Sequence, residues 1–148
     1  MLLTCPRLCA YLLPLKLSHR RCNLAQGKQL GEFKLTATST TFTPGPGGDL
    51  TAQVNFEGEV TGETGGQHRG TLVVVGTPGA KSGTYNYCGV TLQGNGEALA
   101  LSSQGAVEDI GNHKRRLRGV NRFSNGLIAT VEAEGDLLAR TLTGKIYE

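Results

Sequence analysis

The sequence predicts an all-β protein, an eight-stranded antiparallel up-and-down barrel over residues 30–148, and three observations support this fold class. The 148 residues include 22 glycines and no tryptophan, with many threonines and valines, which favours short strands and tight turns. Apolar and polar residues alternate along several segments, as in strands with one buried face. No segment has the length and period of a helix that could cover a sheet. A closed barrel leaves no exposed strand edge, and a two-sheet β-sandwich is the alternative.

Turns rich in glycine and proline divide this domain into its expected strands. The clearest strand is residues 50–61, where Leu50, Ala52, Val54 and Phe56 alternate with polar residues. It follows the Pro- and Gly-rich residues 43–49, which no strand could cross. The expected strands are residues 32–42, 50–61, 69–75, 84–93, 97–103, 113–124, 127–134 and 137–147, with a less regular stretch at residues 102–112.

The fourth strand carries two tyrosines and a cysteine on opposite faces. Tyr85, Tyr87 and Gly89 share one face because side chains alternate along a strand, and Cys88 lies on the other with Val90 and Leu92. No base is placed near Cys88 by any motif, so we interpret it as a small buried hydrophobic residue.

Residues 1–29 differ in character from the rest. They contain five basic residues and no acidic ones, whereas residues 32–148 contain 10 basic and 12 acidic residues, a net charge of −2. The longest apolar run, residues 8–15, is interrupted by Pro14 and is too short for a transmembrane helix. We expect a disordered or targeting-like extension, with an upstream start site as an alternative. The expected location is the cytoplasm, or an exported or organellar one if this segment is a targeting signal.

The most informative stretch is the predicted hairpin over residues 113–134. Asn125-Gly126 favours a two-residue type I′ turn. Counting outward from it pairs Arg118 with Ala133 and Arg122 with Ala129, on the same face as the apolar Val120 and Val131. A second turn at Gly135-Asp136 places Arg140 opposite Val131, on this face too.

A buried guanidinium needs a partner, so two interpretations stay open for Arg118, Arg122 and Arg140. In one, these arginines bind the acidic end of a ligand inside the barrel, beside Tyr85 and Tyr87. In the other, a bulge at Gly119 shifts the register, and Glu132 or Asp109 neutralises the arginines at an end of the barrel.

Motifs for metal binding, hydrolysis and phosphate binding are absent from the sequence. Cys5, Cys9, His19 and Cys22 do not have the spacing of a common zinc site, so we expect no metal and no cofactor. There is no Gly-x-Ser-x-Gly or Walker motif. The acidic balance of the domain disfavours nucleic acid as a partner. A homo-oligomer is left open.

Two segments carry a resemblance to a known family. Residues 56–66, Phe-Glu-Gly-Glu-Val-Thr-Gly-Glu-Thr-Gly-Gly, and residues 142–148, Leu-Thr-Gly-Lys-Ile-Tyr-Glu, resemble pieces of the allene oxide cyclase-like barrels, including uncharacterised bacterial members. The resemblance covers roughly residues 30–148. It implies an eight-stranded barrel with an apolar cavity and, in the plant members, cyclisation of a fatty-acid epoxide. No catalytic motif aligns residue by residue, so no catalytic role follows from it.

Three functions are compatible with these observations. The leading hypothesis is a barrel that binds an apolar or amphipathic anionic small molecule, with Arg118, Arg122, Arg140, Tyr85 and Tyr87 as candidate contacts. The second is a cofactor-free isomerase or cyclase on the same barrel, for which Tyr85, Tyr87, Asn86 and His113 are the side chains to inspect. The third is a structural or interaction barrel with a filled interior. The sequence favours binding over catalysis, and the interior volume separates the third hypothesis from the others.

Overall fold

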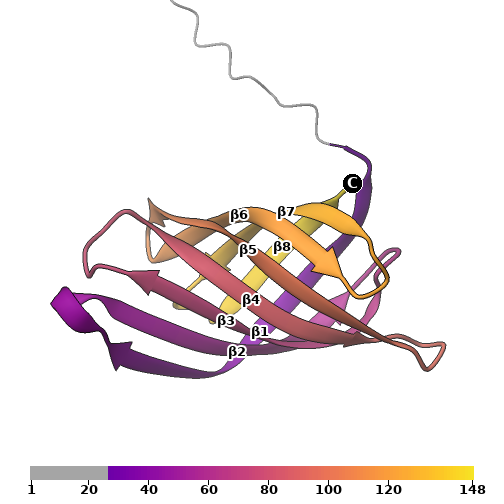
Figure 1. Cartoon of the computed structure of the whole chain (residues 1–148), viewed down its shortest axis with the longest axis horizontal. Helices are drawn as coiled ribbons and strands as arrows, with labels where there is room; N and C mark the ends of the chain where they lie inside the picture. The colour runs from indigo at the N-terminus through magenta and orange to yellow at the C-terminus, as the bar shows by residue number, and fades with distance from the viewer. Residues whose placement is uncertain (1–26) are drawn as a thin grey trace, which may run out of the picture.

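A computed structural model describes residues 27–148 of the chain (Figure 1). The predictions made for residues 1–26, including the cysteines at positions 5, 9 and 22, lie outside these residues. The strands are β1 (Gln29–Pro44), β2 (Leu50–Val60), β3 (Gly66–Gly76), β4 (Ser82–Leu92), β5 (Ala98–Gly111), β6 (Lys114–Phe123), β7 (Ile128–Asp136) and β8 (Thr141–Tyr147), with a short 3₁₀ turn η1 (Pro46–Gly48).

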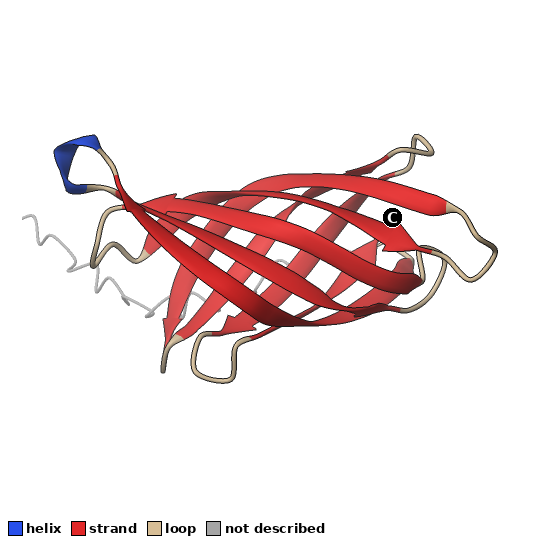
Figure 2. Cartoon of the chain, turned by 90° about the horizontal axis from the view of Figure 1, so that it is seen from below, coloured by secondary structure: helices blue, strands red, loops and turns tan. Residues whose placement is uncertain are grey.

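These strands form a closed barrel in which each strand pairs antiparallel with the next and β8 pairs with β1 (Figure 2). The predicted eight-stranded up-and-down barrel is therefore confirmed. Closure pairs both edges of the sheet, which explains how the chain forms a stable fold without a covering helix. Residues 27–148 contain no helix with the length and apolar character needed to span a membrane.

The two ends of the barrel differ. At the end that carries the β2–β3, β4–β5 and β6–β7 turns, an apolar cluster closes the interior with the side chains of Leu30, Val60, Leu99, Phe123, Ala129 and Ile146. A second apolar cluster, which includes Leu35, Leu72 and Leu117, crosses the middle. The opposite end carries η1 and the β3–β4, β5–β6 and β7–β8 turns (Figure 2). That end is open.

The β6–β7 hairpin forms as predicted, but its turn type and register differ from the prediction. The Gly126 N–H donates to the Phe123 carbonyl oxygen at 3.0 Å, and within this turn Gly126 alone has a positive φ, of +90°. This is a type I turn followed by a left-handed glycine, a three-residue connection instead of a two-residue type I′ turn. The additional residue shifts the register by one, so Arg118 pairs with Glu132 instead of Ala133.

A shift of one residue exchanges the two faces of a strand. Leu117, Asn121 and Phe123 are therefore buried inside the barrel, whereas Arg118 and Arg122 are exposed on its outer surface. The prediction that these two arginines lie on the inner wall is wrong. The ladder of β6 is continuous past Gly119, so the alternative of a bulge there is also wrong, although Arg118 is neutralised by Glu132, as that interpretation expected.

Two further segments differ from the sequence-based assignment. Residues 102–111 continue β5, with a register shift against β6 between Asp109 and Gly111. The sequence does not reveal this strand because its inward positions Ser103 and Gly105 are small and conceal the apolar alternation. The last turn lies at residues 137–140, not at Gly135-Asp136. The Asp136 carboxylate fixes this turn by accepting hydrogen bonds from the N–H groups of Leu138, at 3.0 Å, and Ala139, at 2.8 Å.

Candidate functional site

The open end of the barrel leads into a cavity of about 520 Å³. Its walls are mostly apolar and come from all eight strands, with contributions from Ala37, Ala52, Val54, Phe56, Val74, Val107, Leu117 and Leu142. Small residues at inward positions, such as Ala37 and Ala52, leave this half of the barrel unfilled. Volumes of about 300–1,000 Å³ are typical of small-molecule sites, so the space is large enough for a ligand.

Charged side chains line the mouth of this cavity. Arg115 forms an ion pair with Asp109, and the Gly111 N–H together with Arg115 lowers the pKa of the Asp109 carboxyl. Lys81 and Arg140 also line the mouth, and neither forms an ion pair with any residue in the range 27–148. Of these two, Lys81 already interacts through its charge with the Asp109 carboxylate, whose pKa it helps to lower, so Arg140 is the cation at the mouth best placed to meet an anion.

Exposed apolar side chains surround the same mouth. Phe42 on β1 is 63% exposed, and Leu137 and Leu138 in the β7–β8 turn are 56% and 75% exposed. Phe42 and Leu137 also line the cavity, so its apolar wall continues to the outer surface. An apolar molecule could enter along this wall without crossing a fully polar rim.

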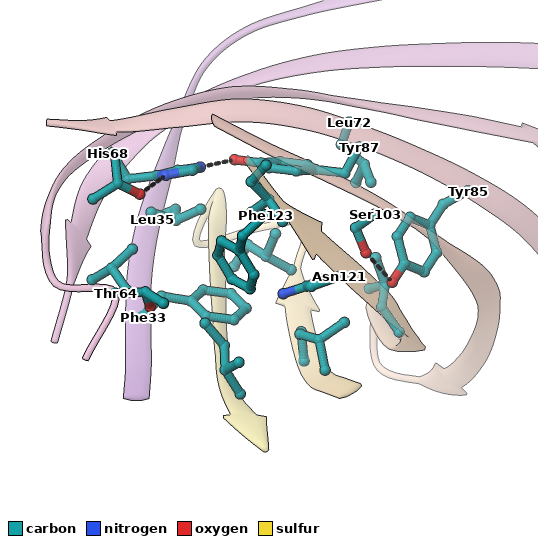
Figure 3. Close-up of a pocket in the computed structure, with 18 residues that line it drawn as sticks. Phe33, Leu35, Thr64, His68, Leu72, Tyr85, Tyr87, Ser103, Asn121 and Phe123 are labelled. Carbon is teal, nitrogen blue, oxygen red and sulfur yellow. Dashed lines mark hydrogen bonds between the residues drawn. The ribbon is translucent and has the colours of Figure 1, made fainter. Parts of the chain in front are cut away.

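A second, smaller space of about 50 Å³ lies deeper in the barrel (Figure 3). We call it the inner chamber. Leu72, Leu117 and Leu142 line both spaces, so the inner chamber adjoins the larger cavity at these three side chains. Its polar lining consists of Thr64, His68, Tyr85, Tyr87, Thr91, Ser103 and Asn121.

His68 is the centre of a buried hydrogen-bond chain in this chamber (Figure 3). Its Nδ1 lies 2.8 Å from Thr91 Oγ1 and its Nε2 lies 2.6 Å from Tyr87 Oη. Burial lowers the pKa of His68 to about 4 and raises the pKa of Tyr87, since burial disfavours the charged form of either group. Both groups are therefore neutral at neutral pH, with one histidine nitrogen donating and the other accepting a hydrogen bond.

Paired glycines make room for this chain. Gly70 on β3 is the register partner of Gly89 on β4, and this pair lies between the His68–Thr91 pair and the Leu72–Tyr87 pair. A Cβ at Gly70 would collide with the Tyr87 hydroxyl, and a Cβ at Gly89 would lie 2.7 Å from His68 Nε2. The missing side chains thus leave the gap that the His68–Tyr87 hydrogen bond crosses.

Tyr85 is accommodated in the same way on the other side of the chamber. Its register partner is Gly105 on β5, whose own partner is Gly119 on β6. The Tyr85 hydroxyl reaches across both glycines, where a Cβ at Gly119 would collide with it, and bonds to Ser103 Oγ at 3.1 Å. Burial raises the pKa of Tyr85 as well.

The structure separates the predicted site residues into three places. Tyr85 and Tyr87 share a face of β4, as the alternation predicted, and this face lies inside the barrel, as the ligand-binding hypothesis expected. Arg140 lines the cavity mouth. Arg118 and Arg122 are on the outer surface, where Arg118 Nε lies 3.1 Å from Glu132 Oε1.

Three further residues singled out in the sequence also lie outside the two cavities. Asn86 is exposed on the outer face of β4, and His113 is exposed in the β5–β6 turn. Cys88 is exposed on the outer surface, so its interpretation as a buried residue is wrong. The two faces of β4 were separated correctly, but the tyrosine face is the inner one.

Sequence reasoning missed His68, Thr64, Ser103 and Asn121. His68 could have been placed inside, because Leu72 lies four residues further along β3 and therefore on the same face. Asn121 was assigned to the wrong face together with the rest of β6. Thr64 lies in a turn, where no periodicity indicates burial.

Comparisons with known protein families, with curated protein sequences and with solved structures found no match to this chain. The resemblance to the allene oxide cyclase-like barrels therefore stays a prediction. Within residues 27–148, no group of three or more His, Cys, Asp or Glu side chains is placed to hold a metal ion.

Proposed function

We propose that this barrel binds an apolar or amphipathic anionic small molecule in the larger cavity. The observation that carries the proposal is the cavity itself, which has about 520 Å³ of space, mostly apolar walls and one open end. Water gains few hydrogen bonds in such a space, so an apolar ligand that displaces it binds favourably.

The charges at the mouth support an anionic end group. Arg140 and Lys81 line the opening without an ion-pair partner among the described residues. An anion at the mouth stays close to solvent, so it loses little hydration while it gains these cationic contacts. The ligand then lies with its apolar body inside the barrel and its charged end at the mouth.

The third hypothesis, a filled structural barrel, is disfavoured by the same cavity. A barrel of eight strands can be filled entirely by its own side chains. Alanines at Ala37 and Ala52, where larger residues would fit, leave this interior unfilled.

A cofactor-free isomerase or cyclase is the second candidate, and the 2.6 Å contact between His68 and Tyr87 favours it. A neutral histidine bonded to a tyrosine hydroxyl can move a proton in a water-poor site. An allene oxide cyclase-like activity would belong to this class. Incubating an unsaturated ketone in D₂O with wild type and Tyr87→Phe tests it by mass spectrometry. Deuterium uptake with wild type alone would support catalysis, and no uptake with wild type would contradict it.

The binding proposal is tested with the fluorescent polyene fatty acid cis-parinaric acid. We expect saturable binding to wild type, and loss of binding in Ala52→Trp, whose indole would occupy the cavity. Gln53→Trp is the matched control, because the neighbouring side chain is exposed on the outer surface. If Ala52→Trp bound the probe as well as Gln53→Trp, or wild type did not bind it, the cavity would not be the site.

The contribution of charge is tested with Arg140→Gln. An exposed cation contributes up to about 1 kcal/mol, so we expect cis-parinaric acid to bind about threefold to fivefold more weakly, with no change for its methyl ester. Arg122→Gln, on the outer surface, is the control. Equal weakening by both variants would show that the effect comes from net charge and not from the mouth.

A further inference from the structure

The inner chamber contains buried polar groups that the protein itself does not satisfy. Thr64 is 2% exposed and Asn121 is 3% exposed. Thr64 Oγ1 is fully enclosed and has no hydrogen-bond partner. The Asn121 amide takes part in none of the side-chain hydrogen bonds found within residues 27–148, and it is not fully enclosed by protein atoms. Both side chains line the chamber, and Figure 3 shows the Asn121 amide directed into it.

The other polar groups of the chamber are already occupied. Both ring nitrogens of His68 have partners, and the Tyr85 hydroxyl is bonded to Ser103. Most buried polar groups in proteins are hydrogen-bonded, and an unsatisfied one lowers stability. Because both of these groups face the same space, a water molecule or a ligand group bound there would satisfy them. The chamber, at about 50 Å³, has room for a few water molecules or for one compact polar group of a ligand.

The chemistry of the lining restricts that occupant. No carboxylate, lysine or arginine lines the chamber, and its histidine is neutral at neutral pH because burial lowers the pKa. A charged group would therefore lose its hydration without an opposite charge to compensate. The Asn121 amide and the Thr64 hydroxyl can each donate and accept, so an uncharged hydroxyl, carbonyl or carboxamide fits them.

We infer that the inner chamber is a subsite for an uncharged hydrogen-bonding group at the inner end of the ligand. This inference rests on the proposed function. The ligand would be two-ended, with its anion at the mouth beside Arg140, an apolar body along the cavity wall, and a neutral polar group between Asn121 and Thr64.

The dimensions of the barrel are compatible with such a molecule. Arg115, at the mouth, and Asn121, in the chamber, lie six residues apart on β6, which corresponds to about 20 Å along the strand. The tilt of the strands makes the distance along the barrel axis shorter. Leu72, Leu117 and Leu142 lie where the two spaces adjoin, and their side chains would contact the apolar body of the ligand.

Calorimetry with hexadecanoate and ω-hydroxyhexadecanoate tests the inference, since the two differ only in a terminal hydroxyl. We expect wild type to bind the hydroxy acid about threefold to tenfold more tightly, the effect of one or two hydrogen bonds. Thr64→Val and Asn121→Leu should remove or reverse this preference. Thr64→Val is expected to fold, because it replaces a hydroxyl that has no partner with a methyl group.

Asn86→Leu and Thr84→Val are the matched controls, because both side chains are exposed on the outer surface of β4 and both variants should keep the preference. If wild type bound neither acid, the proposed function would fail, and the subsite with it. If wild type bound hexadecanoate as tightly as the hydroxy acid, or Thr64→Val kept the full preference, the subsite alone would be refuted and the larger cavity would stand as the binding site.

Discussion

Protonation of His68 should make this protein less stable in mild acid. His68 is 3% exposed, and burial lowers its pKa from the ordinary value of 6.5 to about 4. In the unfolded chain the imidazole takes up a proton as the pH falls through about 6.5, whereas the folded protein resists protonation until about pH 4. The stability due to the neutral His68 is therefore complete above about pH 6.5 and is lost as the pH falls toward 4.

The magnitude follows from the two pKa values. One pKa unit corresponds to about 1.4 kcal/mol, so the fall from 6.5 to about 4 corresponds to about 3 kcal/mol. Integrated down to about pH 4.5, the loss in the free energy of unfolding is about 2.5 kcal/mol. This is a large fraction of the stability of an ordinary domain, so it is measurable.

Urea unfolding followed by circular dichroism, at about pH 7.5 and about pH 4.5, measures this loss in wild type and in His68→Gln. Glutamine does not titrate, so the variant should lose about 2.5 kcal/mol less than wild type between the two pH values. His113→Gln is the control, because His113 is exposed in the β5–β6 turn. Glu32 and Asp109, whose pKa values are lowered, are present in all three proteins and do not affect the comparison. Equal losses in wild type and His68→Gln would refute the reasoning.

Three further predictions concern the barrel itself. His113→Gly should raise the free energy of unfolding by about 0.5–1 kcal/mol in urea unfolding, because His113 has a φ of +58° that glycine adopts freely, and a decrease would contradict this. Gly119→Ala should lower the free energy of unfolding by about 2 kcal/mol, seen as a lower melting temperature, because its Cβ would collide with the Tyr85 hydroxyl. Gly94→Ala, whose Cβ would have nothing within 4 Å, should leave the melting temperature unchanged. Arg118→Ala should cost less than about 1 kcal/mol in chemical denaturation, because its guanidinium is exposed, and a larger cost would argue against its place on the outer surface.

The predicted strands agree best with the structure where apolar and polar residues alternate clearly. β2 begins and ends within one residue of its prediction, because Leu50, Val54 and Phe56 are apolar and their neighbours polar. β5 was predicted too short, because its inner face carries Ser103 and Gly105, which look the same as outer residues in a sequence. A strand whose inward side chains are large and apolar is recognisable from its sequence, whereas a strand whose small inward residues make room for a tyrosine is not.

The β6–β7 hairpin shows the limit of local reasoning. Asn125-Gly126 is compatible with both a two-residue and a three-residue connection, and these two place opposite faces of β6 inside. The choice depends on β5 and β7, whose inward residues Val107 and Ala133 must meet Leu117 from β6. Long-range packing therefore decided which side chains of this hairpin are inside, and with it the position of Arg118.

The sequence by itself determined the fold class, the number of strands, the two faces of β4 and the charge balance of the domain, because each depends on local periodicity or composition. The tertiary structure decided the functional geometry. The register of β3 against β4 brought His68 to Tyr87 and Thr91, and the closed barrel placed Asn121 of β6 at the same chamber. Such contacts, like the volume of the cavity, depend on strand register and on where small residues face one another, and neither is encoded within a single strand.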